Sequence, residues 1–478
     1  MRNKINYILL QLCLGFSLSS CSYFDSLLDE KTDSTLSLLE TLEQCDYVLN
    51  GMKQSSGIYT YLLDDDYEIL DVENMYGVRG NKLTELYYMA SFEFVKNDKS
   101  KEGLVENAYW ENAYKDIWNT NVVLENIDHV KGSNDVLRDQ VKGEAYLMRA
   151  YSHYMLCKNY GIQYNANAEL NPGVPLSLSF DSKAELPRAS VEEVYAQVEH
   201  DIKSAMQYLS TEKQNAATTY RGSIVAAKAL LMKVYLDKAV VDTKYYNEVI
   251  KLGEEILQVD DFLYDYNLSE DLDEATFVVF NNREVIMNRM LEKVENQYNL
   301  LLNTHISGYP FLVFTPGAEL ADNDLRRVYT YSDAEKTLGR TTMKFGLKFE
   351  TLTLLNFGLT NAEVYLNLME AYIRNNEANK ALPLFNKLKA NRYENYTDAA
   401  SVSLDDVKEE RRKEFIGVGF RFYDIKRYRA LGEYTKPIIR TNKLGVESGR
   451  LDDDSHFVLP IPLKILRLNS NIKQNIYK

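Results

Sequence analysis

The sequence lacks the residues and motifs on which most catalytic and metal sites depend. It has only five histidines and four cysteines among 478 residues, and no Cys-X-X-Cys pair or Cys/His spacing of the kind that binds zinc. It also lacks His-Glu-X-X-His, Gly-X-Ser-X-Gly, a P-loop, and Gly-X-Gly-X-X-Gly after a strand. We therefore predict no enzyme activity, no catalytic residue, no metal site and no cofactor.

Positive charge is also in short supply, and long apolar runs are missing after the N-terminus. The chain has 55 Lys and Arg against 70 Asp and Glu, a formal charge of −15, whereas a protein that grips a phosphate backbone needs a basic face. No later stretch is apolar enough over a sufficient length to span a bilayer. These properties argue against nucleic acid as a partner and against an integral membrane protein.

The N-terminus has the pattern of an exported lipoprotein. Two basic residues precede a short apolar run that ends at Leu18, which is typical of a signal peptide. Two serines then stand directly before Cys21, the small-residue context that a lipoprotein-processing peptidase requires; an ordinary secretory signal with a chance cysteine is the alternative. We predict lipid (palmitate and related acyl chains) on Cys21, a signal peptide at 1–20, a lipidated tether at 21–35 and a single domain at 36–478.

A few single residues carry expectations of their own. Of the cysteines that remain after the lipidated one, Cys157 lies in a mostly apolar helix, and a bridge to Cys45 is possible in an exported protein, but we expect two free thiols. His153 and His200 lie in helices, where we expect them to be hydrogen-bonded residues at the margin of the core.

The body of the chain contains repeated pairs of amphipathic helices. Apolar residues recur at helical spacing in segments that begin at Glu144, Ala226 and Asn361, and each is followed by a second helix, at 190–209, 244–258 and 377–390. The second and third pairs are close in length to the ~34-residue tetratricopeptide unit. A proline-containing loop at 161–189 splits the first pair, and a further pair is predicted in 36–53 and 105–128.

Two regions interrupt this pattern. Residues 54–104 are rich in Asp, Tyr, Asn and Gly, and residues 261–355 carry only short apolar runs such as Thr276–Phe280 and Tyr309–Phe314. We predict a mostly α fold, in which tetratricopeptide-like helical repeats (mainly 105–260 and 360–430) carry an irregular, loop-rich half with short β-strands. Binding residues often lie on loops that a rigid scaffold holds.

Charged clusters have simpler explanations than catalysis. The stretch at 409–428 mixes both signs, with Glu409 and Glu410 spaced to pair with Lys413 and with Arg421 spaced to reach Asp424, so we expect solvated or bridging helix faces that end at the glycines near 417–419. The acidic runs at 64–66 and 452–454 are predicted to be solvated turns, with calcium as a second hypothesis.

Six motifs in order resemble the SusD/RagB family of outer-membrane, nutrient-binding lipoproteins. The hallmark is Glu410-Arg411-Arg412-Lys413-Glu414-Phe415, followed by Gly419 and Arg421-Phe422-Tyr423-Asp424-Ile425. The others are the segment from Gly143 to Tyr151 with Val174-Pro175-Leu176, Pro187-Arg188-Ala189-Ser190, Arg221-Gly222-Ser223, the closing Leu459-Pro460-Ile461-Pro462 with its following asparagines, and the lipobox. Val418 and Phe420 depart from the family pattern, which usually has polar or charged residues there.

The resemblance implies a function without chemistry. Members of the family sit on the outer membrane, facing the cell surface, and partner a SusC-like TonB-dependent porin, for which they capture glycans or, in the RagB branch, peptides. A flat aromatic face flanked by hydrogen-bonding groups suits a sugar ring. Candidates in the irregular regions are Tyr76, Arg79, Asn81, Tyr309 and Phe311. A glycosidase, whose two carboxylates need a set separation, and a helical-repeat scaffold for proteins are the rival classes; the scaffold gives no reason for the excursion at 261–355.

Overall fold

The computed structural model describes a large part of the chain, in fourteen segments. They are residues 39–52, 60, 63–69, 88–98, 108–181, 184–268, 282–289, 312–314, 320–327, 331–337, 340–345, 358–416, 418–441 and 444–478. All statements below refer to these segments.

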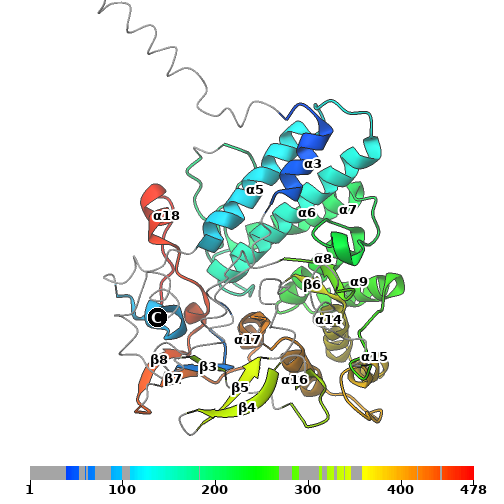
Figure 1. Cartoon of the computed structure of the whole chain (residues 1–478). Helices are drawn as coiled ribbons and strands as arrows, with labels where there is room; N and C mark the ends of the chain where they lie inside the picture. Colours follow the sequence, from blue (N-terminus) through cyan, green and yellow to red (C-terminus); the bar gives the residue numbers. More distant parts are fainter. Residues whose placement is uncertain are drawn as a thin grey trace, which may run out of the picture.

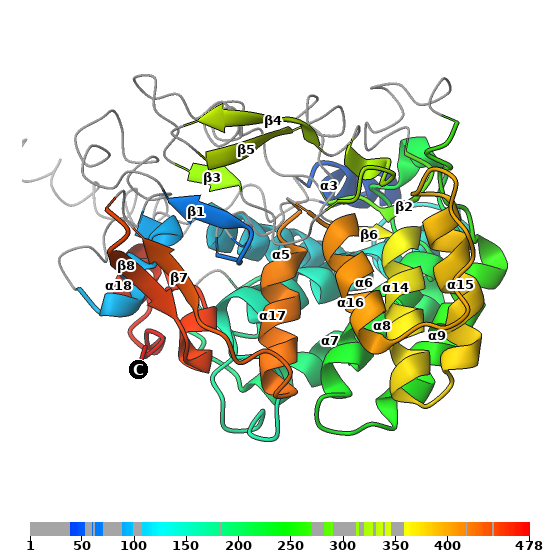
Figure 2. The same ribbon diagram turned by 90° about the horizontal axis from the view of Figure 1, so that it is seen from below.

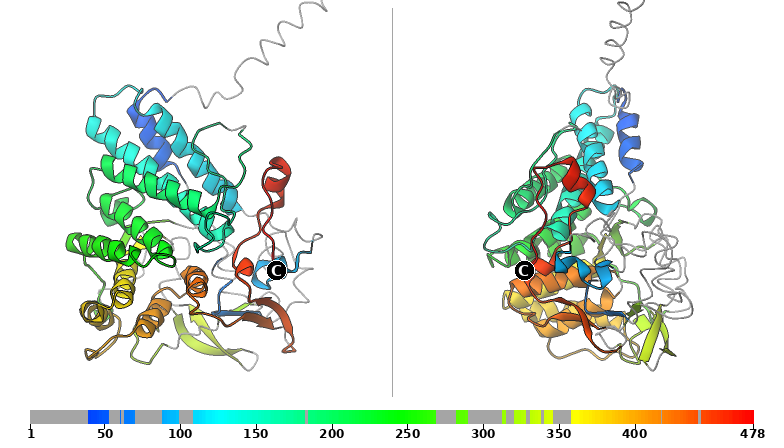
Figure 3. Two further views of the ribbon diagram at one scale, coloured as in Figure 1. Left: turned by 180° about the vertical axis from the view of Figure 1, so that it is seen from behind. Right: turned by 90° about the vertical axis from the view of Figure 1, so that its left-hand side faces the viewer.

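Helices form one side of the molecule and follow each other roughly in chain order (Figure 1). Seen from behind, they run from α3 at one end to α15 and α16 at the other (Figure 3). Their bounds are α3 (Leu42–Asn50), α5 (Ala108–Asn126), α6 (Asp135–Tyr160), α7 (Val191–Tyr208), α8 (Ile224–Lys238), α9 (Tyr245–Val259), α14 (Asn361–Arg374), α15 (Ala378–Ala390), α16 (Leu404–Glu414), α17 (Phe420–Ala430) and α18 (Leu463–Leu468), with short 3₁₀ turns at Glu93–Lys96, Ala216–Thr218 and Asp454–Phe457.

The predicted helix pairs are confirmed. Helix α6 packs on α7, α8 on α9, and α14 on α15, while α3 packs on α5 and α6. Neighbouring pairs also contact each other, through α7 with α8 and through α9 with α14. The fold is therefore mostly α, as the periodicity predicted, and each pair buries the face that its neighbour leaves open. No helix in the described segments has both the length and the hydropathy of a membrane span.

Local sequence explains where several helices begin. Ser190 accepts a hydrogen bond from the backbone N–H of Glu193, whose side chain accepts one from the backbone N–H of Ser190, so α7 opens with a capping box. Ser403 and Asp406 do the same for α16. Gly419 precedes α17 with φ of 79°, a left-handed conformation that glycine adopts without a Cβ clash. The predicted break near 417–419 is confirmed.

Short antiparallel strands form two-stranded ribbons, of which β1, β3, β4 and β5 lie over one side of the helices (Figure 2). They are β1 (Tyr67–Ile69), β2 (Val285–Met287), β3 (Leu312–Phe314), β4 (Tyr331–Thr337), β5 (Arg340–Phe345), β6 (Leu359–Thr360), β7 (Ile438–Thr441) and β8 (Glu447–Leu451). They pair as β1 with β3, β2 with β6, β4 with β5 and β7 with β8. Short strands in both predicted irregular regions are confirmed, and β3 lies within the predicted run at 309–314; the run at 276–280 lies outside the described residues.

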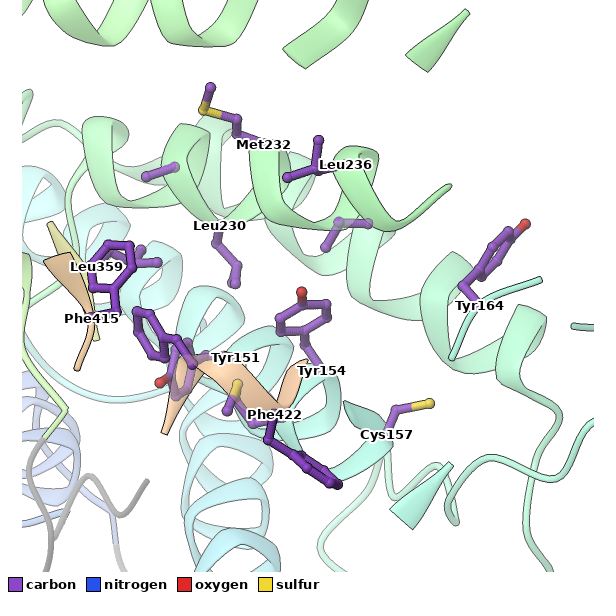
Figure 4. Close-up of a cluster of buried hydrophobic side chains, with 14 of the residues drawn as sticks. Tyr151, Tyr154, Cys157, Tyr164, Leu230, Met232, Leu236, Leu359, Phe415 and Phe422 are labelled. Carbon is purple, nitrogen blue, oxygen red and sulfur yellow. The ribbon is translucent and has the colours of Figure 1, made fainter. Parts of the chain in front are cut away.

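One large hydrophobic core joins the helix pairs to α16 and α17, the helices that carry most of the family hallmark (Figure 4). Many of its members are tyrosines, whose rings fill the core while their hydroxyls reach buried acceptors. Tyr154 and Tyr195, for example, both donate to the carboxylate of Asp237, at 2.8 and 2.9 Å. Lys158 balances the charge of that carboxylate at 2.9 Å. Tyrosine, of which the chain has 36, thus contributes directly to the core.

The prediction of two free thiols is confirmed, whereas the prediction for His153 is not. Cys45 and Cys157 are buried free thiols that belong to different hydrophobic clusters. His200 lies on the surface of α7. The expectation for His153 was wrong: it is completely buried, and neither ring nitrogen has a hydrogen-bond partner within the described segments. The charged groups that act on it, Asp201 and Arg149, pair with each other at 2.7 Å.

Close approach of three helices depends on one glycine. A Cβ on Gly253 of α9 would lie 2.9 Å from Cε of Met232 on α8 and 3.1 Å from Cβ of Leu368 on α14. Both neighbours are buried. A small residue therefore lets α9 settle between the preceding and the following repeat, as the tetratricopeptide pattern predicts.

Replacing this glycine with a larger residue is expected to destabilise the stack. Gly253→Val should lower the free energy of unfolding by about 1–3 kcal/mol, since the branched side chain overpacks a filled interface. Lys251→Val, at an exposed position of the same helix, introduces the same β-branched residue without the contact. Chemical denaturation followed by circular dichroism compares the two; equal losses would contradict a steric role for Gly253.

Acid is expected to destabilise the protein through His153. Burial lowers the pKa of His153 to about 4, whereas an exposed histidine has a pKa of about 6.5. Between these values the unfolded chain binds a proton that the folded protein does not, so the free energy of unfolding falls as pH drops from about 6.5 to about 4, by roughly 3 kcal/mol at most.

The variant His153→Leu isolates this contribution. As pH drops from about 6.5 to about 4, the free energy of unfolding of the wild type should fall more than that of His153→Leu. His200→Leu, at a position whose side chain is 68% exposed, is the control for exchanging a histidine for leucine. Parallel pH profiles for wild type and His153→Leu would show that the histidine is not the group responsible.

Candidate functional site

The residues predicted to bind ligand lie outside the described part of the chain. This holds for Tyr76, Arg79 and Asn81 in the first irregular region and for Tyr309 and Phe311 in the second, as well as for Cys21. The structure does describe the chain that flanks both groups. The geometry of those flanking segments therefore defines the candidate site.

The short β1–β3 ribbon brings the two irregular regions together. Its strands are antiparallel, with Tyr67 opposite Phe314 and Ile69 opposite Leu312. The chain leaves β1 at Ile69 toward the first group of predicted residues, and it enters β3 at Leu312 directly after Phe311. Two segments more than 200 residues apart thus join the described structure at the same end of one ribbon.

Three consecutive aspartates anchor the start of this ribbon. In the segment Asp64–Asp66, which we call the aspartate turn, the carboxylate of Asp65 accepts hydrogen bonds from two nitrogens of Arg421, each at 2.8 Å. Asp66 accepts from Arg412 at 2.6 Å. The backbone carbonyl of Asp64 accepts from Arg440 of β7 at 2.9 Å. Arginines from three elements at the C-terminal end of the fold therefore fix residues that directly precede β1.

The prediction that 64–66 is a solvated turn was wrong. Asp64 and Asp66 are buried. Burial and the neighbouring carboxylates raise the pKa of Asp64 well above its usual value. Burial also tends to raise the pKa of Asp65, but the hydrogen bond and charge of Arg421 outweigh it and hold that pKa below its usual value. The guanidinium groups of Arg421 and Arg412 engage Asp65 and Asp66, so the turn acts as an anchor. Oxygens of the three carboxylates lie within 4.8 Å of each other, and calcium at this turn stays a hypothesis.

Helix α16 holds the second irregular region with its acidic residues. Glu410 and Glu414 both pair with Arg326, at 2.7 and 3.2 Å, and Arg326 is 1% exposed. Glu414 also pairs with Arg392 at 3.0 Å, and Arg392 in turn pairs with Glu284, next to β2, at 3.0 Å. These contacts bind 282–289 and 320–327 to the helical scaffold.

The hallmark pairs differ from those that helical spacing suggested. Arg421 reaches the aspartate turn instead of Asp424, because Asp424 is taken by Arg411, whose Nε lies 2.8 Å from the carboxylate. Glu410 is buried and pairs with Arg326, whereas the predicted contact between Glu409 and Lys413 is present at 3.8 Å. The mixed charge is therefore an internal ion-pair network, in which most partners are far apart in sequence.

Val418 and Phe420, which depart from the family pattern, are buried. The ring of Phe420 lies 5.0 Å from that of Phe415, and the ammonium of Lys233 lies 4.5 Å above it. Apolar packing replaces the polar contacts expected at these two positions.

Lys426 of α17 connects the hallmark to the first repeat. Its ammonium donates to the backbone carbonyls of Lys158, at 2.5 Å, and Gly161, at 2.9 Å, at the C-terminal end of α6. A cation at this end of a helix is favoured by the helix dipole. Burial and the nearby charge of Lys158 nevertheless lower the pKa of Lys426 to about 7.

Two hollows in the described helical half lack an open aromatic face for a sugar. A cavity between α6, α8, α14, α16 and α17 has a volume of about 40 Å³, room for about three waters and too small for a sugar ring. A groove of about 340 Å³ between α9, α14 and α15 has Tyr365 and Tyr372 at its floor. Their rings are covered, with only 1% and 5% of each residue exposed. Neither ring offers the open face that stacking on a sugar requires.

Sequence reasoning missed the anchoring role of the aspartate turn, Arg412 and Arg421. The only local signals were three consecutive acids and an unusually dense group of arginines. Their pairing spans about 350 residues, so helical spacing rules cannot detect it.

Comparisons with known proteins agree on one family. A family model described as starch-binding associating with outer membrane matches residues 24–236, and a SusD family model matches residues 361–477. No curated protein matches the chain.

Solved structures share the fold. The chain is similar to a SusD superfamily protein from Bacteroides vulgatus (21% identity, 91% of this chain and 99% of that one, TM-score 0.71) and to another from Bacteroides thetaiotaomicron (22%, 91% and 99%, 0.70). It is also similar to surface glycan-binding protein A from Bacteroides uniformis (17%, 92% and 100%, 0.69).

Removing the central arginine of the acidic network is expected to be costly. Arg392→Met leaves Glu284 and Glu414 buried with less compensation, and the free energy of unfolding should fall by about 3–5 kcal/mol. Lys387→Met, which removes a more exposed pair between Lys387 of α15 and Asp261, should cost at most about 1 kcal/mol. Equal effects in urea denaturation would contradict the network's role.

Proposed function

This chain belongs to the SusD/RagB family, and we propose on that basis that it is a cell-surface lipoprotein that captures an oligosaccharide and does no chemistry on it. The observation that carries the proposal is the match of residues 24–236 to a model described as starch-binding associating with outer membrane. The name of the Bacteroides uniformis relative, a surface glycan-binding protein, supports the same ligand class.

We assign the ligand contacts to the two irregular regions. Tyr76, Tyr309 and Phe311 supply aromatic faces for the C–H patches of a sugar ring, and Arg79 and Asn81 supply hydrogen-bonding groups for its hydroxyls. The support is indirect: both segments join the described structure at the same end of the β1–β3 ribbon, and the groove of the helical half has covered rings. Both facts favour this end of the ribbon over the helical half.

The proposed partner is a SusC-like TonB-dependent porin in the outer membrane. In this proposal the signal peptide at 1–20 is removed, lipid on Cys21 anchors the protein, and the tether at 21–35 leads to the domain at 36–478. The captured glycan is then delivered to the porin for import. No nucleic acid takes part, and the acidic net charge of −15 agrees with that.

A glycan array tests the ligand class. The full-length lipoprotein, purified in detergent, should bind a defined group of oligosaccharides, and those saccharides should raise its melting temperature, because a ligand that binds only the folded state stabilises it. Tyr76→Ala and Tyr309→Ala should each weaken binding by about tenfold, a loss typical of a central aromatic contact. Tyr47→Ala is the matched control, since Tyr47 is 70% exposed on α3.

Each contrary outcome has a distinct meaning. Binding of peptides in place of saccharides would show that the ligand is a peptide, as in the RagB branch of the family. Absence of any small ligand, together with capture of other proteins, would favour a helical-repeat scaffold. Release of reducing ends from a bound saccharide would contradict the absence of catalysis.

A further inference from the structure

We infer that the ion pairs between the aspartate turn and the arginines of α16 and α17 position the β1–β3 ribbon, and that Arg412 and Arg421 thereby govern glycan affinity without contacting the glycan. This inference rests on the proposed function. Its structural part concerns only described residues, so it can be tested separately.

The contacts have the geometry of a clamp. Two nitrogens of Arg421 face the two oxygens of Asp65, each at 2.8 Å, a bidentate arrangement that fixes orientation as well as distance. Arg412 bridges the turn, with Nη2 at 2.6 Å from Asp66 and at 3.2 Å from Asp65. Two guanidinium groups therefore hold two adjacent carboxylates, and the turn has little freedom to rotate.

The ribbon needs such a clamp because it is too short to hold itself. Each strand has only three residues, and an isolated two-stranded ribbon is marginal in water. Strand β1 follows Asp66 without an intervening loop, so the position of the turn sets the position of the strand. Strand β1 also contacts β7, and strand β3 contacts β5. Strand β3 is paired only with β1 among the described strands, so its position follows that of β1.

Both the arginines and the aspartates of the clamp are largely shielded from solvent. The side chains of Arg412 and Arg421 are each 13% exposed, Asp66 is 2% exposed and Asp65 is 21% exposed. Shielded pairs are weakly screened by salt, and removing one partner leaves a charge that is costly to bury. Because the guanidinium groups face the turn, they act on a ligand only through the ribbon, which makes them positioning residues.

Hydrogen exchange of the full-length lipoprotein tests the structural part. Arg421→Gln and Arg412→Gln should speed exchange at least tenfold in peptides that cover 67–69 and 312–314, while peptides from α6 and α8 keep wild-type rates. Arg421→Lys should recover part of the protection, since it keeps the charge but loses the bidentate contact. Arg429→Gln is the control: Arg429 lies on the same helix and pairs with the exposed Asp454 at 2.9 Å, and its loss should leave the ribbon unchanged.

Affinity for the saccharide that gives the strongest wild-type array signal tests the functional part. It should fall at least tenfold in Arg421→Gln, mainly through faster dissociation, and partly recover in Arg421→Lys. Unchanged exchange in the ribbon, or faster exchange throughout the protein, would overturn the clamp. Faster ribbon exchange with unchanged affinity would overturn the positioning role. A wild type that binds no saccharide would instead contradict the proposed function, and the exchange result would still decide the structural part.

Discussion

A buried charge has to meet an opposite charge, and helix α16 organises the molecule around this constraint. Within five residues it presents acids to Arg326 and Arg392 and arginines to Asp424 and the aspartate turn. Each sign selects a different region of the chain: the acids hold the second irregular region, and Arg412 holds the first. Because both signs alternate along α16, its acids and its arginines pair with different regions of the chain. These pairs explain how so charged a helix can be largely buried.

The helix pairs supply what this network needs, a well-packed body with a large buried core. Tyrosines contribute by filling the core with rings while their hydroxyls satisfy buried carboxylates such as that of Asp237, and Gly253 lets adjacent repeats approach closely. In such an interior an ion pair is strengthened by the low dielectric. Packing and charge pairing therefore depend on each other: the repeats exclude water, and the ion pairs attach to the repeats those segments that have too few apolar residues to pack alone.

Sequence reasoning worked where the physical signal is local. Apolar periodicity located the helix pairs, and the glycines at 417–419 marked the break between α16 and α17, because both depend on neighbours in the chain. It failed where partners are distant. Nothing near Asp65 indicates Arg421, and helical spacing favoured Asp424 for that arginine. His153 was misjudged for a related reason, since hydrophobic pattern alone does not say whether a polar residue within an apolar stripe will find a partner. The candidate ligand residues remain a prediction.

The antiparallel pairing of β1 with β3 has an evolutionary consequence. The aspartate turn ties β1 to the body of the protein at the end away from Ile69, so changes in the chain beyond Ile69 and before Leu312 leave the residues of this attachment unaltered. Insertions there meet only a small closure penalty, since that penalty grows slowly with loop length. The ends of the ribbon at Ile69 and Leu312 therefore offer natural splice points for grafting foreign recognition sequences onto the same scaffold.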